Sequence, residues 1–178
     1  MEGVARQRYW GKAVDVLKTL ERGGISRVDW QRIVIHHTAS PTEVCRLGKN
    51  VPVDATMIRE WHKTKGWSDI GYHFVIMPDG HCEEGRPLYR QGAHCNVGHR
   101  NFIGIGICLV GNFSELKVPE SQINGLVNKV VQLMETFKLG IESVELHRDV
   151  PGAATECPGQ YFPADVFGKK LEERFRCT

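Results

Sequence analysis

The sequence predicts a single α/β domain, in which a central mixed, mainly parallel β-sheet is flanked by helices. Apolar residues at helical spacing alternate with short β-rich runs along the chain, which is typical of this class. The segment Pro78-Asp79-Gly80 is a turn signal between two such runs, so one hairpin is expected within the sheet. No repeat or long linker divides the 178 residues. We therefore expect one domain over 1–178, with 1–28 as an N-terminal helical extension.

The first half of the chain predicts two helices and three strands. The first helix has an apolar face formed by Val14, Leu17 and Leu20. It ends before Gly23, and the β-rich run 30–36 follows. Asp54 is suited to cap a second helix that Gly66 ends, and this helix has an apolar face formed by Met57, Ile58 and Trp61. A strand over 72–77 then turns into another near Cys82.

The second half predicts a central strand, a long helix, a short strand and a final helix. Glycines alternate with apolar residues over 102–110, which favours a central strand with another element packed closely against it. The longest helix begins with Pro119, ends at Gly140 and has an apolar stripe formed by Ile123, Leu126, Val127, Val130, Met134 and Phe137. A short strand over 143–146 follows. The last helix begins at Pro163, and its inward residues are Val166, Phe167 and Leu171.

Composition and charge exclude several classes of protein. The net charge of +2 comes from acidic and basic residues mixed along the chain, without the basic run typical of nucleic-acid binders. No apolar stretch is long enough for a membrane span. The first residues lack the apolar segment of a secretory signal, so we expect either a cytoplasmic start or a leader that has been removed.

Six cysteines are present, and their spacing contains no CxxC pair. Cys108 lies in an apolar run and is expected in the core. The other cysteines outside the candidate metal site are compatible with free thiols or a disulfide, and they are Cys45, Cys82, Cys95 and Cys177. The redox compartment therefore stays open.

Histidine and cysteine residues at strand ends suggest a metal site. His36 and His37 end a predicted strand, and because strand side chains alternate between faces, only one of them is expected to reach a given site. His147 follows another strand, and Cys157 lies on the loop after it. Imidazole and thiolate are ligands that zinc prefers, and three protein ligands leave a fourth position for water.

Two other interpretations of these residues stay open. A closed structural zinc site would take His37 or another cysteine as a fourth ligand. A metal-free Cys-His pair would use Cys157 as nucleophile and His147 as base. The spacing of the residues does not choose among the three.

Several segments, in this order, resemble the zinc amidases of the peptidoglycan recognition protein and phage amidase-type lysozyme family. They are IVIHHTAS (33–40), IREWHKTKGWSDIGYHFVIMPDG (58–80), EEGRPLYRQGAH (83–94), FIGIGICLVGNF (102–113) and ELHRDVPGAATECPG (145–159). The resemblance implies an N-acetylmuramoyl-L-alanine amidase, which cleaves the bond between N-acetylmuramic acid and the L-alanine of the stem peptide in peptidoglycan. It also implies a zinc site in a groove at one edge of the sheet.

The resemblance also implies roles for individual residues. By position, His36, His147 and Cys157 match the Zn2+ ligands of the family, and Tyr72 and Thr155 match its catalytic positions. Relatives that only bind peptidoglycan typically replace the cysteine, so Cys157 favours activity. Four further residues lie in segments that border the family's substrate groove, and they are His37, Trp67, Arg86 and His94.

The sequence departs from animal recognition proteins, which carry a close pair of cysteines soon after the HHT segment. Cys45 has no such neighbour. The segment RLGKNVPVDATMIREWH (46–62) and the short loop before VPESQ (118–122) look nearer to bacterial or phage members. A peptidoglycan or muropeptide substrate is expected, with action at the cell wall, periplasmic or extracellular, and a cytoplasmic site as the alternative. Two other functions stay open: a non-catalytic peptidoglycan-binding module, and an amidase-like domain that regulates a protein partner, although no such partner is indicated.

Overall fold

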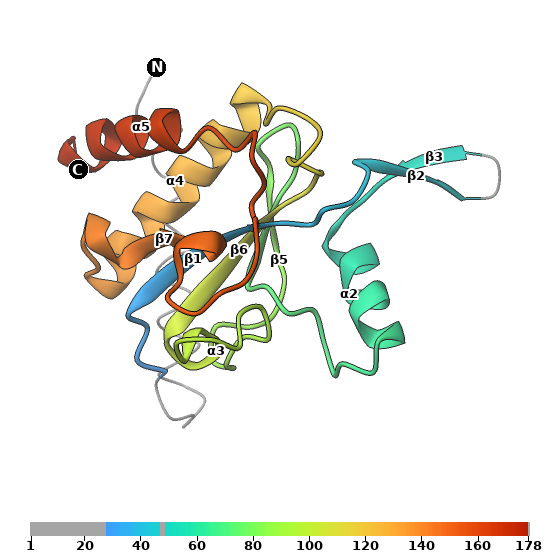
Figure 1. The fold of residues 1–178 in the computed structure, drawn as a ribbon, viewed down its shortest axis with the longest axis horizontal. Helices are drawn as coiled ribbons and strands as arrows, with labels where there is room; N and C mark the ends of the chain where they lie inside the picture. Colours follow the sequence, from blue (N-terminus) through green and yellow to red (C-terminus); the bar gives the residue numbers. More distant parts are fainter. Residues whose placement is uncertain (1–27, 47–48, 178) are drawn as a thin grey trace, which may run out of the picture.

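The computed structural model describes residues 28–46 and 49–177, which form a five-stranded sheet covered on both faces (Figure 1). The elements in chain order are β1 (Arg32–His37), β2 (Glu43–Arg46), β3 (Lys49–Pro52), α2 (Ala55–Thr64), β4 (Phe74–Ile76), β5 (Cys82–Glu84), α3 (Arg100–Ile103), β6 (Gly104–Leu109), α4 (Glu120–Phe137), η1 (Ile141–Ser143), β7 (Val144–Leu146), η2 (His147–Asp149) and α5 (Ala164–Arg176). The N-terminal helix expected within 1–28 lies outside the described residues, which begin at Val28.

The predicted fold class is confirmed. The strands lie in the order β5-β4-β6-β1-β7, and all neighbours are parallel except the hairpin of β4 and β5. The turn before β5 contains Gly80 at φ +88°, a conformation that glycine adopts without strain. The mixed, mainly parallel sheet therefore has the expected single hairpin.

Strand alternation separates the main core from the face that carries the candidate site. Ile33 and Ile35 of β1 pack with β6 residues and with α4 and α5, in a core that includes Leu126 and Phe167. His36 lies on the opposite face of β1, away from these helices. The candidate site is thus built on the face opposite α4 and α5.

Helix α2 begins as predicted, because the Asp54 carboxylate accepts a hydrogen bond from the Met57 N–H at 2.7 Å. Met57 and Ile58 are buried against the sheet, and Trp61 packs beside them. Gly66, at φ +84°, follows the end of the helix. This helix therefore covers part of the same sheet face as the candidate site.

Several details differ from the sequence prediction. Phe102 belongs to the short helix α3, and β6 begins only at Gly104. Pro119 is the N-cap of α4 rather than its first helical residue, and Lys138 rather than Gly140 ends the helix, in the left-handed conformation at φ 56°. Val166 is 50% exposed, because Phe167 and Leu171 are four residues apart and share the inward face of α5.

The sequence prediction also missed the antiparallel pair β2 and β3. Figure 1 shows this hairpin extending away from the five-stranded sheet, above α2. Within the part of the chain that the structure describes, no helix has the length and apolar character to cross a membrane.

Candidate metal centre

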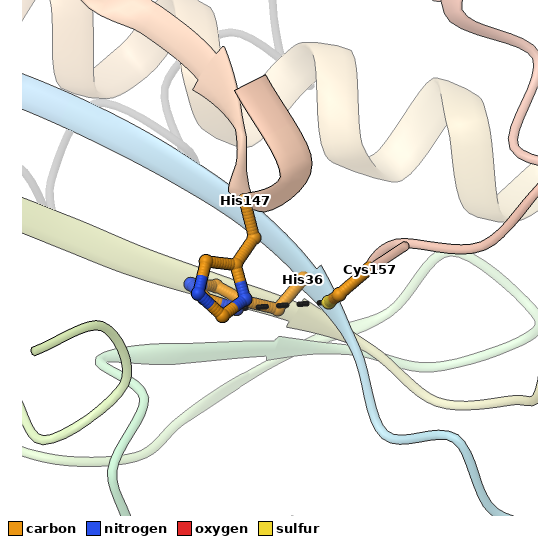
Figure 2. A group of neighbouring side chains, drawn as sticks. All are labelled: His36, His147 and Cys157. Carbon is orange, nitrogen blue, oxygen red and sulfur yellow. Dashed lines mark hydrogen bonds between the residues drawn. The ribbon is translucent and has the colours of Figure 1, made fainter. Parts of the chain in front are cut away.

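Three predicted metal ligands come together at the carboxyl ends of two neighbouring strands. His36 lies near the end of β1, His147 directly follows β7, and Cys157 lies on the loop before α5. Because β1 and β7 are parallel, their carboxyl ends lie at the same end of the sheet. Figure 2 shows the three side chains pointing toward one another from these separate segments.

The distances between the three side chains suit a tetrahedral metal ion. The Sγ of Cys157 lies 3.8 Å from the Nδ1 of His36, and the ring centroids of His36 and His147 are 4.5 Å apart. One donor atom from each residue lies within 4.8 Å of the other two. Zinc bond lengths and tetrahedral angles separate a nitrogen and a sulfur ligand by roughly 3.5 Å. Two imidazoles and a thiol in this arrangement therefore fit zinc.

Burial keeps both imidazoles in the neutral form that a metal requires. It is the main cause that lowers the pKa of His36 far below 6.5, with smaller effects from His94 and His147. It also lowers the pKa of His147. Burial raises the pKa of the Cys157 thiol to about 11, although a backbone hydrogen bond from His37 opposes this shift. The cysteine is therefore a thiol until a metal ion displaces its proton.

The loop that carries Cys157 is held by hydrogen bonds from its own segment. The backbone N–H of Arg148 donates to the carbonyl of Cys157 at 2.8 Å, and its guanidinium donates to the carbonyl of Gly159 at 2.8 Å. The Thr155 hydroxyl oxygen accepts from the Cys157 N–H at 3.2 Å. Thr155, predicted as catalytic, therefore lies directly beside a predicted ligand.

Tyr72, the other predicted catalytic residue, lies beside the three candidate metal ligands. Its ring centroid is 5.3 Å from that of His36. Burial, followed by the nearby sulfurs of Cys108 and Cys157, raises the pKa of Tyr72 well above 10. Its phenol therefore keeps its proton at neutral pH and can act as a hydrogen-bond donor.

The residues predicted to line the groove have different environments. Trp67 is 43% exposed and packs against His62, with ring centroids 4.6 Å apart. Arg86 is buried, and its guanidinium donates to backbone carbonyls, including those of Ile70 at 2.7 Å and Gln91 at 3.0 Å. The predicted substrate contacts of Trp67 and Arg86 stay predictions.

His37 and His94 are already hydrogen-bonded inside the protein. The Nδ1 of His37 accepts from the Phe113 N–H at 3.1 Å, which places its side chain on the face of β1 opposite His36. His94 contacts His36 through Nδ1 at 3.0 Å and the Gly104 carbonyl through Nε2 at 3.0 Å. Strand alternation therefore correctly predicted that only one residue of the His36/His37 pair reaches the site.

Two buried histidines near the site, His62 and His73, were not among the predicted site residues. His62 accepts from the Gly71 N–H at 3.0 Å, and its ring lies 5.6 Å from that of Tyr72. His73 accepts from the Gly106 N–H at 3.0 Å, and burial is the main cause that lowers its pKa to about 3. His73 directly follows Tyr72 in a β-rich run, where neighbouring side chains point to opposite faces of the strand. This alternation is the sequence signal that could have predicted a buried position for His73.

The cysteine predictions are partly resolved. Cys108 is fully buried opposite His36 in the β1–β6 register, so its predicted place in the core is confirmed. Cys95 and Cys177 are free thiols, as are Cys108 and Cys157.

Comparisons with known proteins agree with this arrangement. The family model described as N-acetylmuramoyl-L-alanine amidase matches residues 26–160. The endolysin of Enterobacteria phage K11 is 36% identical over 114 residues, covering 61% of this chain and 72% of that protein. The endolysin N-acetylmuramoyl-L-alanine amidase LysCS from Clostridium intestinale superposes with a TM-score of 0.70 at 34% identity, covering 82% of this chain and 86% of that one.

A further solved structure is similar in fold and includes a bound ligand. It is the complex of tracheal cytotoxin with the ectodomains of peptidoglycan recognition proteins LCa and LCx, with a TM-score of 0.64 at 26% identity, covering 80% of this chain and 83% of that one. The matched family segment contains all three candidate metal ligands and every strand of the five-stranded sheet. The chain therefore belongs to the N-acetylmuramoyl-L-alanine amidase family.

Proposed function

We propose that this protein is a zinc-dependent amidase that hydrolyses the bond between N-acetylmuramic acid and L-alanine in peptidoglycan or its muropeptide fragments. The observation that carries the proposal is the convergence of His36, His147 and Cys157 in a chain of the amidase family. In this proposal the substrate is cell-wall material. The endolysins that resemble this chain support a site of action at the wall.

The donor set favours a catalytic over a closed structural zinc site. Among the described residues, no fourth His, Cys, Asp or Glu belongs to the group formed by His36, His147 and Cys157. His37 is on the other face of β1 and hydrogen-bonded to Phe113, so it does not complete the set. When bound, zinc supplies a Lewis acid that polarises the scissile carbonyl and makes hydroxide available near neutral pH.

The properties of Cys157 also argue against a metal-free cysteine nucleophile. A reactive cysteine needs a lowered pKa, whereas burial raises the pKa of Cys157 to about 11. The positive charge of Arg148 lowers this pKa, but by less than burial raises it. A ligand role, in which the metal displaces the proton, accounts for a half-buried thiol that lies beside the imidazoles of His36 and His147.

Tyr72 and Thr155 are proposed to act on the reacting carbonyl and on the attacking water. The Tyr72 phenol is a neutral donor next to His36, so it can stabilise negative charge that develops on the carbonyl oxygen. The Thr155 hydroxyl oxygen accepts from the Cys157 N–H, which leaves its proton available to orient water or substrate. Neither residue carries a charge in these roles.

Trp67 is the predicted groove residue best suited to direct substrate contact, because much of its indole is exposed while His62 supports it from the side. An exposed indole offers an apolar face to a sugar ring or stem peptide. Arg86 and His37 have polar atoms committed to backbone groups, so we propose that they shape the walls of the site.

Digestion of purified peptidoglycan tests the proposal. With zinc present, the protein should release stem peptides with new L-alanine amino termini and leave free lactyl carboxylates on muramic acid, both detected by mass spectrometry, and chelation should abolish both. Two peptidoglycan types, with lysine or diaminopimelate at the third stem position, would define the preference. Wall binding without new amino termini would instead support a non-catalytic binding module.

A further inference from the structure

We infer that His94 is a positioning residue that fixes the tautomer of His36, so that the Nδ1 of His36 is presented to the metal. This inference rests on the proposed zinc site, and it assigns His94 a task other than the substrate contact that the sequence predicts. It depends on a chain of hydrogen bonds that leads from a backbone carbonyl to the metal-binding group.

The direction of this chain follows from its first member. A carbonyl oxygen only accepts hydrogen bonds, so the contact of 3.0 Å between Gly104 O and His94 Nε2 requires a proton on Nε2. The two ring partners of His94, a carbonyl and an imidazole, carry no negative charge, so burial favours the neutral ring. The Nδ1 of a neutral His94 is then a bare acceptor.

The second contact transmits this choice to His36. His94 Nδ1 lies 3.0 Å from His36 Nε2, and a bare Nδ1 requires the proton of this hydrogen bond to come from His36. A neutral His36 with its proton on Nε2 has its lone pair on Nδ1. This is the atom that faces Cys157 Sγ at 3.8 Å. Metal-binding histidines commonly have their tautomer fixed by a hydrogen bond of this kind.

The surroundings of His94 hold its ring in place. A Cβ atom added at Gly92 or Gly106 would lie 2.4 or 2.5 Å from the His94 Cδ2, so both glycines provide space that no other residue would leave. The Asn101 side chain accepts from the His94 N–H at 2.7 Å and from the Cys95 N–H at 2.8 Å. The backbone and the ring of His94 are thus constrained from several sides.

Two substitutions separate the acceptor toward His36 from the donor toward Gly104. In His94→Asn, the side-chain oxygen is placed near the former Nδ1 and can still accept from His36. In His94→Gln, the amide reaches the former Nε2 and can donate to Gly104, but it offers His36 no acceptor at the Nδ1 position. A role limited to packing would make both variants behave according to their stability alone.

The test measures the His36 tautomer in the zinc-free protein by ¹⁵N NMR of its imidazole, and zinc affinity by competition with a chromophoric chelator. We expect His94→Asn to keep the Nε2-protonated tautomer and the wild-type affinity. We expect His94→Gln to give mixed tautomers and to lose about 10–100-fold in zinc affinity. Equal tautomer populations and affinities in the wild type and both variants would overturn the inference.

A glycine pair provides a test that deletes no polar group. Gly106→Ala should displace the His94 ring and reproduce the effects of His94→Gln on tautomer and affinity. Gly168→Ala, in α5, meets no atom within 4 Å and should leave both unchanged. Loss of affinity in Gly106→Ala with an unaltered His36 tautomer would contradict the proposed route.

The readouts are independent of amidase activity. If the variants show the expected tautomer and affinity changes but the wild-type protein cleaves no peptidoglycan, the role of His94 stands and the proposed function is refuted. If the wild-type protein cleaves peptidoglycan but the His36 tautomer is unchanged in every variant, the proposed function stands and the role of His94 is refuted.

Discussion

The backbone N–H of His37 donates a hydrogen bond to the Sγ of Cys157 at 3.4 Å, although the two residues are 120 positions apart in the sequence. His36 offers its side chain to the same site, while the His37 side chain lies on the other face of β1. Two consecutive residues thus support the candidate metal centre through different groups. A hydrogen bond to sulfur favours the thiolate, which is the form that binds zinc.

Replacement of a proposed ligand should remove zinc and activity together. Cys157→Ala leaves two imidazoles in place of three donors, so we expect neither stoichiometric zinc nor detectable release of L-alanine amino termini. Metal analysis of the purified variant and peptidoglycan digestion measure the two effects. Cys177→Ala, which removes an exposed free thiol, should keep both properties. Full activity of zinc-free Cys157→Ala would contradict the metal mechanism.

Tyr72→Phe should separate catalysis from metal binding. The variant keeps the ring beside His36 but loses the phenolic donor, so turnover should fall by about 10²–10³-fold, the usual effect of losing one such donor. Zinc content should stay at the wild-type level. Tyr89→Phe, at an exposed position, serves as the control. An unchanged kcat in Tyr72→Phe would exclude the residue from the mechanism.

The loop that carries Cys157 should tolerate a side chain at Gly152, before the cysteine, better than at Gly159, after it. Both glycines have positive φ, +89° and +100°, so alanine introduces strain of about 1–2 kcal/mol at either position. A Cβ at Gly152 meets open space, whereas one at Gly159 lies 2.3 Å from the Phe113 carbonyl carbon. Gly159→Ala should therefore show the greater loss of stability in denaturant unfolding, and it should also lower zinc affinity. Equal effects of the two substitutions would contradict this account.

The stability of the zinc-free protein should fall as the pH decreases below about 6.5, in part because of His62. Burial is the main cause that lowers the pKa of folded His62 from 6.5 to about 4. The unfolded chain binds this proton at a higher pH than the folded chain does. The contribution of neutral His62 to the free energy of unfolding is therefore complete above pH 6.5 and is lost as the pH falls toward 4.

His62→Asn should reduce this pH dependence. The asparagine oxygen can still accept from the Gly71 N–H, but it does not titrate. Urea unfolding at several pH values should show a slope smaller by at most about 1.4 kcal/mol per pH unit, the limit for one proton. His81→Asn, in the exposed turn between β4 and β5, is the matched control. A variant with the wild-type slope would show that His62 makes no contribution.

The sequence by itself determined the elements whose signals are local. The alternation of β1 correctly predicted that His36 and His37 point to opposite faces, and Asp54 correctly marked the beginning of α2. Such patterns depend on residues a few positions apart. The family motifs also identified the three residues that meet at the candidate metal centre. A motif match assigns each residue by its position in the sequence, so it does not require the distances between the residues to be known.

Only the tertiary structure decided which contacts form between distant segments. It links His94 to His36 across 58 residues and commits the Arg86 guanidinium to backbone carbonyls. It also decided that Val166 faces solvent, since the direction of a helix face depends on what packs against it. Hydrogen-bond partners and burial depend on how parallel strands and their connecting loops come together, and no local pattern encodes that arrangement.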